Sequence, residues 1–350
     1  MNISPTHDSN EPMRSVPMDQ LSAHLDRGWD LALRGDAEGA SSSARRALEL
    51  DGESPEAYNL LGYASALLGD SEEAMDLYEQ AIALDDEYLD AILNLAALMI
   101  HPMGDYAAAE RYAQEALAFA ESKEERLEVL MLKFEALLGQ DKQRAAKDLL
   151  ERMPKPTLAS PQHQFLLGRA WYEVGEFDRA EVALSEAAQD MQDSADTHYY
   201  LGMTLGELGD EMGAIDALIV ARDLDQREVD APSTLTRQVF RRASLAAWES
   251  VSPELRSGVQ DVELFVTDLP GGEMIADGVD PRSFLMLELL PEGDDSARTL
   301  PCGSLRVFIY KKNVERACKD PDSITEDIAK AITEELKRLL DGESDAAITH

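Results

Sequence analysis

A period of 34 residues is the feature that most constrains the fold of this sequence. Glycines and alanines recur at this interval in two separate parts of the chain, in the same internal order. The first set pairs Gly28 with Gly62, Gly35 with Gly69, Ala40 with Ala74 and Ala47 with Ala81; the second pairs Gly168 with Gly202, Gly175 with Gly209, Ala180 with Ala214 and Ala187 with Ala221. Periods of about 20 to 50 residues are typical of repeat proteins, whose units stack to bury a continuous core.

The repeated residue types suit two helices that cross closely. The small residues leave room at the crossing, where a larger side chain would push the helices apart. The "GD" and "GE" steps place a glycine at the end of the first helix, since glycine tolerates a left-handed conformation. The segments "AYNLLGYASALLGDSEEAMDLYEQAIALD" and "FLLGRAWYEVGEFDRAEVALSEAA" resemble the tetratricopeptide repeat (TPR).

The resemblance implies a mainly α fold, a TPR solenoid of about six helical hairpins over residues 21–228, whose first helices line a concave groove. The predicted repeats are 21–54, 55–88, 89–123, 124–153, 161–194 and 195–228. The fourth is degenerate, and the proline-rich "MPKPTLASP" after it predicts a bend or discontinuity. Residues 1–20 are polar and are predicted to be a disordered tail.

The groove is the expected binding site for a protein or peptide. In this repeat family it is lined by positions two, five, nine, twelve and thirteen of the first helix. The resemblance therefore predicts these groove residues: Trp29, Asn59, Tyr63, Phe165, Arg169, Tyr172, Tyr199 and Met203. Aromatic and Met side chains beside an Arg are typical of binding hot spots. The alternative is that several of them pack between adjacent hairpins.

Polar groove positions limit the kind of peptide expected. Asn59 and Asn94 could hydrogen-bond the backbone of an extended peptide. A Lys/Asn/Arg clamp for a C-terminal carboxylate is not expected, because Leu25, Asp90 and Leu93 stand where such a clamp would need lysine.

A second domain is predicted after about residue 230, where the 34-residue period stops. Apolar spacing predicts a helix over 232–250, and apolar, β-branched runs predict strands over 262–268 and 305–310, with a possible third over 284–290. Loops are expected at "GGEMIADGVDP" and "PEGDDSARTLPCGS". The sequence thus predicts a small α+β domain.

An amphipathic helix is predicted to close this domain at "DSITEDIAKAITEELKRLLDG". Ser323 and Glu326 form a potential capping box at its start, and Gly342 stands just past its end. The domain is predicted to span 235–343 and to be followed by a tail over 344–350.

The order of these elements, with "VFIYKKNVERACKD" before the last helix, resembles the minimal bacterial zincin-like metallopeptidases (MMP-like, Zincin-1 type). This resemblance implies an H-E-x-x-H motif whose positions fall at Thr333, Glu334 and Lys337. Histidines at i and i+4 would hold zinc while the glutamate acts on the bound water. Thr333 and Lys337 cannot supply imidazoles, and His350 is the only histidine beyond the repeats. No catalytic residue, metal or cofactor is therefore expected.

Helical geometry favours the same interpretation of "TEELK". One apolar stripe is predicted along the last helix, formed by Ile324, Ile328, Ile332, Leu336 and Leu339. Thr333 and Lys337 lie on the opposite side, and Glu334 and Arg338 are spaced to pair at i and i+4. The stretch is predicted to be a solvent-facing helix surface.

Composition limits the partners and the compartment. The 32 Lys and Arg residues against 69 Asp and Glu give a formal charge of −37, which argues against nucleic acid and anionic membranes and favours protein partners, including basic ones. The two cysteines, Cys302 and Cys318, lack metal-binding or disulfide spacing. No signal peptide or long apolar run is recognised, so a cytoplasmic location is expected.

Three functional hypotheses follow. The leading one is a non-catalytic interaction scaffold or adaptor that uses the groove and carries a metal-less zincin-like domain. The alternative is an atypical metallopeptidase-like hydrolase whose carboxylates, Glu334, Glu335 and Glu343, hold a hard cation. A third possibility is that basic residues near Lys311 and Lys312 dock the C-terminal domain in cis onto the acidic repeats, or bind an acidic partner in trans.

Overall fold

The computed structural model describes residues 17–153, 160–228, 235–257, 259, 261–290, 304–318 and 323–341. The chain divides into two compact units, Met1–Thr157 and Leu158–His350. The division falls within the proline-rich segment between the fourth and fifth predicted repeats. The second unit therefore holds the last two predicted repeats together with the predicted α+β domain.

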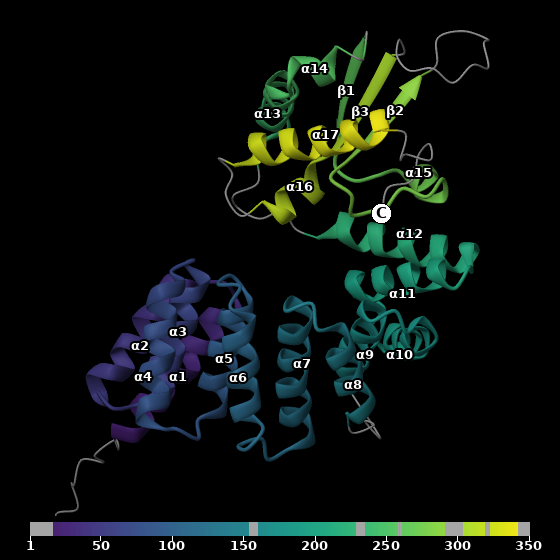
Figure 1. Ribbon diagram of the computed structural model, residues 1–350. Coiled ribbons are helices and arrows are strands. Elements are labelled where there is room, and N and C mark those ends of the chain that lie inside the picture. Colours follow the sequence, from purple (N-terminus) through teal and green to yellow (C-terminus); the bar gives the residue numbers. More distant parts are fainter. Residues whose placement is uncertain are drawn as a thin grey trace, which may run out of the picture. The chain divides into compact units, whose positions relative to one another are not determined.

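The first unit consists, over its described residues, of four helical hairpins (Figure 1). Their paired helices are α1 (Pro17–Leu33) with α2 (Ala37–Leu50), α3 (Pro55–Leu67) with α4 (Ser71–Leu84), α5 (Leu89–Ile100) with α6 (Tyr106–Ala116), and α7 (Lys123–Gly139) with α8 (Gln143–Arg152). Within this unit α1 packs against α3, α3 against α5 and α5 against α7, and each first helix also packs against its own partner. This is the stacking that the period predicted.

The second unit begins with two more hairpins and continues into a three-stranded sheet with helices. The hairpins pair α9 (Pro161–Glu173) with α10 (Phe177–Asp190), and α11 (Ala195–Glu207) with α12 (Glu211–Arg227). The remaining elements are α13 (Arg237–Ser250), α14 (Pro253–Arg256), β1 (Val262–Thr267), α15 (Gly272–Ala276), β2 (Leu285–Leu290), β3 (Ser304–Tyr310), α16 (Lys311–Ala317) and α17 (Ile324–Asp341).

The turns inside the hairpins follow the predicted glycine chemistry. Gly35 adopts a φ of 78° at the end of α1, where an L side chain would be strained. The next residue, Asp36, accepts a hydrogen bond from the backbone N–H of Gly39 and so caps α2. Asp141 takes the left-handed position in the degenerate fourth repeat, with a φ of 58°. An aspartate tolerates this conformation better than most residues, which explains how the repeat keeps its turn.

The close helix crossing is confirmed in the repeats. A Cβ atom added to Gly168 would lie 2.6 Å from the side chain of Leu184 on the partner helix α10. At Gly62 the ring of Tyr78 on α4 would be 2.8 Å away. Gly28 differs, because its nearest neighbour is Leu60 of the next hairpin. The glycine there serves the stacking between hairpins as well as the crossing within one.

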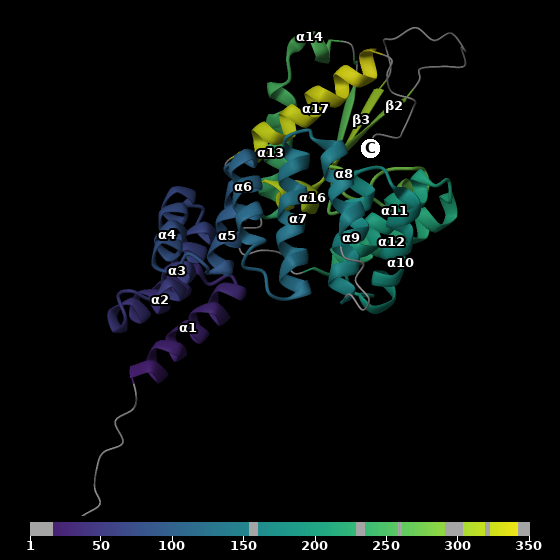
Figure 2. The ribbon, with the colours of Figure 1, turned by 60° about the horizontal axis from the view of Figure 1, so that its bottom comes forward.

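The sheet has the strand order β1-β3-β2, with β1 parallel and β2 antiparallel to β3. The buried side of β3 presents Leu305, Val307 and Ile309 to a core that includes residues of α13 and α17. Both views show these two helices on the same side of the sheet (Figures 1 and 2). The predicted apolar stripe of α17 is confirmed, because Ile324, Ile328, Ile332 and Leu336 are buried in this core.

Details of the second unit differ from the predictions. The segment expected to be one loop around 271–281 contains the short helix α15. Ser323 donates its hydroxyl to Asp327 at 2.8 Å, a contact that the sequence did not predict. Arg338 pairs with Glu335, at 3.4 Å, instead of with Glu334. The tail predicted over 1–20 is wrong at its end, because α1 already begins at Pro17. Cys302, Gly342, residues 1–16 and the predicted tail over 344–350 lie outside the described residues.

We expect Gly168→Ala to lower the free energy of unfolding by about 1 to 3 kcal/mol, because its methyl group overlaps Leu184. Helix propensity alone would favour the alanine by up to about 1 kcal/mol, so the sign of the effect is informative. Gly272→Ala in α15 is the matched control, since no atom lies within 4 Å of its added Cβ. Urea unfolding followed by circular dichroism measures both variants. An unchanged or more stable Gly168→Ala chain would contradict a tight crossing at this position.

Candidate protein-binding site

A cluster of aromatic side chains lies on the first helices of the two hairpins of the second unit. Phe165, Arg169 and Tyr172 stand one turn apart on α9, which puts them on one face. Tyr199 and Tyr200 come from α11, which packs against α9. All five side chains are half-buried. The cluster therefore combines apolar area with partial access to solvent.

The rings of this cluster contact one another edge to face. Tyr200 is central, with its ring centroid 6.0 Å from that of Phe165, 5.7 Å from Tyr172 and 5.7 Å from Tyr199. The guanidinium of Arg169 lies 6.0 Å from the ring centre of Tyr200. Aromatic pairs of this kind are worth about 0.5 to 1.5 kcal/mol beyond their area, so the cluster is preorganised.

The tyrosine hydroxyls of the cluster stay protonated. Burial, followed by the negative charge of Glu207, raises the pKa of Tyr172. Burial also raises the pKa of Tyr200, against the opposing charge of Arg169. Both groups are therefore neutral hydrogen-bond donors at physiological pH.

Tyr199 is engaged by a turn of the α+β domain. Its hydroxyl donates a hydrogen bond to a carboxylate oxygen of Asp280 at 3.0 Å. The guanidinium of Arg282 lies 4.5 Å from the centre of its ring. Burial, and then the charge of Asp280, raise the pKa of Tyr199. One of the predicted groove residues is thus covered by another part of the same unit.

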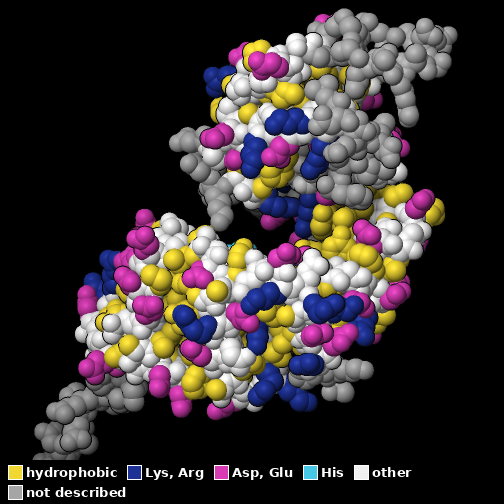
Figure 3. Space-filling model, in the orientation of Figure 1, with side chains coloured by type: hydrophobic (Ala, Val, Ile, Leu, Met, Phe, Trp, Pro, Cys, Tyr) yellow, Lys and Arg dark blue, Asp and Glu magenta, His cyan; other side chains and the backbone are white. Residues whose placement is uncertain are grey.

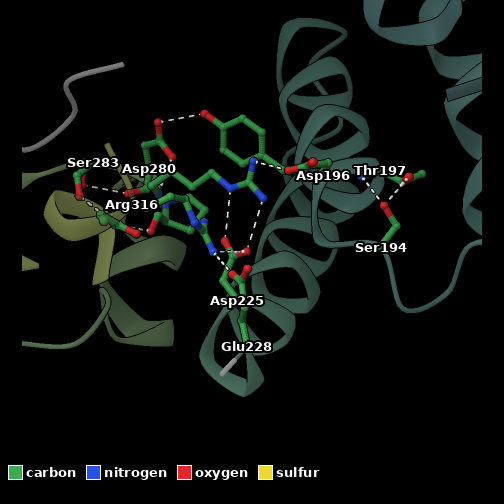
Figure 4. Close-up of polar contacts among 12 residues, drawn as sticks. Ser194, Asp196, Thr197, Asp225, Glu228, Asp280, Ser283 and Arg316 are labelled. Carbon is green, nitrogen blue, oxygen red and sulfur yellow. Dashed lines mark hydrogen bonds and ion pairs between the residues drawn. The ribbon is translucent and has the colours of Figure 1, made fainter. Parts of the chain in front are cut away.

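The turn at residues 280–283 is held in shape from within its own domain. The Asp280 carboxylate accepts from the backbone N–H of Arg282 at 2.8 Å, and the Ser283 hydroxyl donates to the Asp280 carbonyl at 2.9 Å. Asn313 of α16 is buried and donates to the carbonyls of Pro281 and Ser283 at 2.8 and 2.7 Å. Figure 4 shows Asp280 and Ser283 beside each other on this turn, with Asp280 nearer to the helices of the last hairpin. The turn is therefore a rigid support for Arg282.

Asp225 of α12 is the centre of an ion-pair network. Its side chain is 3% exposed, and it accepts hydrogen bonds from Arg282 at 3.1 and 3.4 Å and from Arg316 of α16 at 2.8 Å. Arg282 also pairs with Asp196 at 2.7 Å, and Arg316 with Glu228 at 2.6 Å. Figure 4 shows Asp225 and Glu228 pointing toward Arg316. Three carboxylates of the last hairpin thus share two arginines.

The protonation of Asp225 follows from this arrangement. Burial by itself would raise the pKa of its carboxyl group. The hydrogen bonds and positive charges of Arg316 and Arg282 outweigh burial and lower the pKa below its usual value. Asp225 is therefore ionised at neutral pH, and its charge is matched.

Two further cations of the α+β domain have different roles. Lys312 donates to the carbonyls of Gln226 and Glu228, at 3.2 and 2.9 Å, where a helix C-terminus favours positive charge. Lys311 is buried and pairs with Glu315 at 2.6 Å inside its own domain. The expectation that Lys311 meets the repeats is therefore wrong, because α16 turns this side chain inward. The contacts to α12 come from Lys312 and Arg316.

The predicted groove residues of the first unit have mixed environments. Trp29 and Tyr63 are half-buried and contact each other, with ring centroids 5.3 Å apart. Asn59 is fully buried, donates to the Tyr88 hydroxyl at 3.3 Å and accepts from Asn94 at 2.9 Å. Its amide therefore links neighbouring hairpins, which is the packing role weighed as the alternative.

Met203, one of the predicted groove residues, follows Tyr199 by one turn on α11 and is half-buried. Other residues of the candidate site were missed by the sequence reasoning. Tyr200, the hub of the aromatic cluster, was not predicted. Asp225 was also missed, although it continues the buried alanine stripe of α12 at Ala217 and Ala221. A carboxylate on a buried stripe needs a charged partner, and that was the available signal.

The positions of the zincin motif show no metal site. Within the described residues, no group of three or more His, Cys, Asp and Glu side chains could hold a metal ion. Thr333 donates its hydroxyl to the carbonyl of Ala329 at 2.7 Å, while Glu334 and Lys337 are exposed. Of the alternative carboxylate set, Glu335 pairs with Arg338, and Glu343 lies outside the described residues.

We expect Asp225→Asn to destabilise the second unit by about 3 kcal/mol at pH 7, since two arginines lose a buried charged partner. The pKa of Asp225 is lower in the folded chain than in the unfolded chain. Its stabilising effect is therefore present above about pH 4 and is lost as the pH falls through the lower, folded value. Unfolding free energies of both chains, measured from pH 7 downward, should converge in that range.

Asp223→Asn is the control for this experiment. Asp223 pairs with the adjacent Arg222, and its side chain is 47% exposed. Its loss should cost at most about 1 kcal/mol at any of these pH values. Equal effects of the two substitutions would contradict a buried network centred on Asp225.

Comparisons with known proteins agree with this fold. Residues 55–88 match the family model of the tetratricopeptide repeat. The structure resembles PilF of Pseudomonas aeruginosa, with 20% identity, a TM-score of 0.50, and coverage of 65% of this chain and 98% of PilF. It also resembles PilW, a type IV pilus biogenesis factor, with 15% identity, a TM-score of 0.50, and coverage of 59% and 94%.

A further solved structure is YrrB, described as a TPR protein with an unusual peptide-binding site, at 18% identity, a TM-score of 0.39, and coverage of 54% and 95%. Such identities show the fold alone. No curated protein matches the sequence. The matches do not bear on a zincin-like identity for residues 235–343, which stays a prediction. Residues 55–88 thus match a tetratricopeptide repeat, within a fold that resembles those of PilF and PilW.

Proposed function

We propose that this chain is a protein-interaction scaffold or adaptor that binds a segment of a partner protein along the first helices of its repeats. The observation that carries the proposal is the half-buried aromatic cluster around Tyr200. Rigid aromatic side chains supply large contact area and lose little conformational entropy on binding. The TPR fold supports the same function, since it presents such side chains on successive first helices.

The charge of the chain favours a basic partner. The formal charge of −37 attracts cationic segments and speeds their association. Acidic side chains are scattered over the face drawn in Figure 3 and do not gather in one place. Attraction of this kind is general, so the aromatic cluster would supply the specific contacts.

The C-terminal α+β domain has a non-catalytic role in this proposal, and its contacts with α12 amount to docking in cis. The residues at the three zincin motif positions support this view, because neither a threonine nor a lysine replaces a zinc-binding imidazole. Among the described residues, no helix combines the length and apolar content needed to cross a membrane. A cytoplasmic scaffold remains part of the proposal.

The proposal is tested by changing Tyr172 and Tyr200 together to Ala in the full chain. Proteins captured from a cell extract by the immobilised wild-type chain are quantified by mass spectrometry and compared with those captured by the double variant. We expect at least a tenfold loss for the specific partners, about 1.4 kcal/mol or more, because two hot-spot rings are removed.

Tyr58→Ala is the matched control. Tyr58 lies on α3, outside the cluster, and its hydroxyl reaches the Gly52 carbonyl at 3.4 Å. This variant should retain the wild-type set of captured proteins. Identical capture by all three chains, with circular dichroism showing that each is folded, would overturn the proposed site.

A further inference from the structure

Three side chains of the last hairpin surround the guanidinium of Arg282. The two oxygens of Asp225 accept side-on from its Nε and one Nη, at 3.1 and 3.4 Å. Asp196 accepts from the other Nη at 2.7 Å. The centre of the Tyr199 ring lies 4.5 Å from Cζ, the central carbon of the guanidinium. A forked donor set, two carboxylates and an aromatic face are the features by which proteins recognise arginine.

These features would select arginine over lysine. An ammonium group is compact and cannot donate side-on to both oxygens of Asp225 while it also reaches Asp196. The ring of Tyr199 favours a flat, weakly hydrated cation. The side chains that bind the Arg282 guanidinium belong to α11 and α12, while Arg282 itself comes from the turn of the α+β domain.

The Arg282 side chain can leave this position without leaving the buried charge of Asp225 unpaired. Arg316 holds Asp225 independently, at 2.8 Å, so the carboxylate keeps one cationic partner. The Asp196 side chain is 62% exposed and would return to water. Asn313 holds the backbone of the turn. The Arg282 side chain would therefore leave the contact with Asp196, Tyr199 and Asp225 by rotating, without a movement of the turn. Lys312 and Arg316 would still hold the domain against α12.

We propose that Asp196, Tyr199 and Asp225 form an arginine-binding subsite, and that Arg282 occupies it in competition with an arginine of a basic partner segment. The subsite adjoins the aromatic cluster through the contact of Tyr199 with Tyr200, 5.7 Å apart. This inference rests on the proposed function and assigns ligand chemistry to one end of the binding site. The partner segment thus carries an arginine beside residues that pack on the tyrosines.

The test uses a fluorescein-labelled peptide with the sequence of residues 278–284, GVDPRSF, and the full-length chain. Fluorescence anisotropy should show at least tenfold tighter binding to Arg282→Met than to the wild type, since the internal competitor is gone. Methionine keeps an apolar stem of similar bulk to that of arginine and removes the guanidinium. A peptide with lysine in place of its arginine should bind Arg282→Met at least fivefold more weakly than the original peptide does.

Three further variants sharpen the result. Arg282→Met combined with Tyr199→Ala should lose the gain, because the aromatic floor is removed. Arg242→Ala changes an exposed arginine on α13 of the same domain and should bind the peptide as the wild type does. Arg282→Ala is a second substitution that removes the guanidinium from the subsite. Thermal unfolding confirms that each chain is folded.

Equal binding of the peptide to the wild type and to both folded Arg282 variants would overturn the arginine subsite. So would equal affinity for the arginine and lysine peptides. These results are distinct from failure of the proposed function, which is read from protein capture by the Tyr172 and Tyr200 double variant. If protein capture depends on Tyr172 and Tyr200 while peptide affinity does not depend on Arg282, the scaffold function stands and the arginine subsite is overturned.

Discussion

A carboxylate that has lost nearly all its water must be matched by positive charge, and Asp225 imposes this requirement on the second unit. Two arginines from different segments of the α+β domain meet it, and each also reaches a more exposed carboxylate of the last hairpin. Packing of α12 against α15 accompanies these ion pairs. The position of Arg282 over Tyr199, and so the state of the binding site at that end, follows from this one buried charge.

Local rules made the repeats predictable. Gly168 and Gly35 could be placed from the sequence because a close crossing and a left-handed turn each demand a particular residue. The stripe of α17 and the strands followed from periodicity. The pairing of Asp225 with Arg316 did not, because the two residues are 91 positions apart and no spacing rule links them. The contact of Asn59 with Tyr88 was not predictable for a similar reason, since Tyr88 lies in the next hairpin.

The segment that resembles the zincin-like family makes structural contacts in this structure. In "KKNVER", Lys312 and Arg316 contact α12, Asn313 supports the turn at 280–283, and Lys311 pairs internally with Glu315. Every one of these residues is thus employed in building or attaching the domain.

The α+β domain packs on α12, and this packing limits where repeats could be added to or removed from the series of hairpins. A solenoid normally exposes the apolar side of its last helix until a polar capping element follows. Here α15 and the Arg222 contact to the Pro270 carbonyl take that place. A duplicated repeat inserted after α12 would separate Asp225 from both of its arginines. We therefore expect a gain or loss of repeats to be tolerated before the final hairpin and not at its junction with the α+β domain.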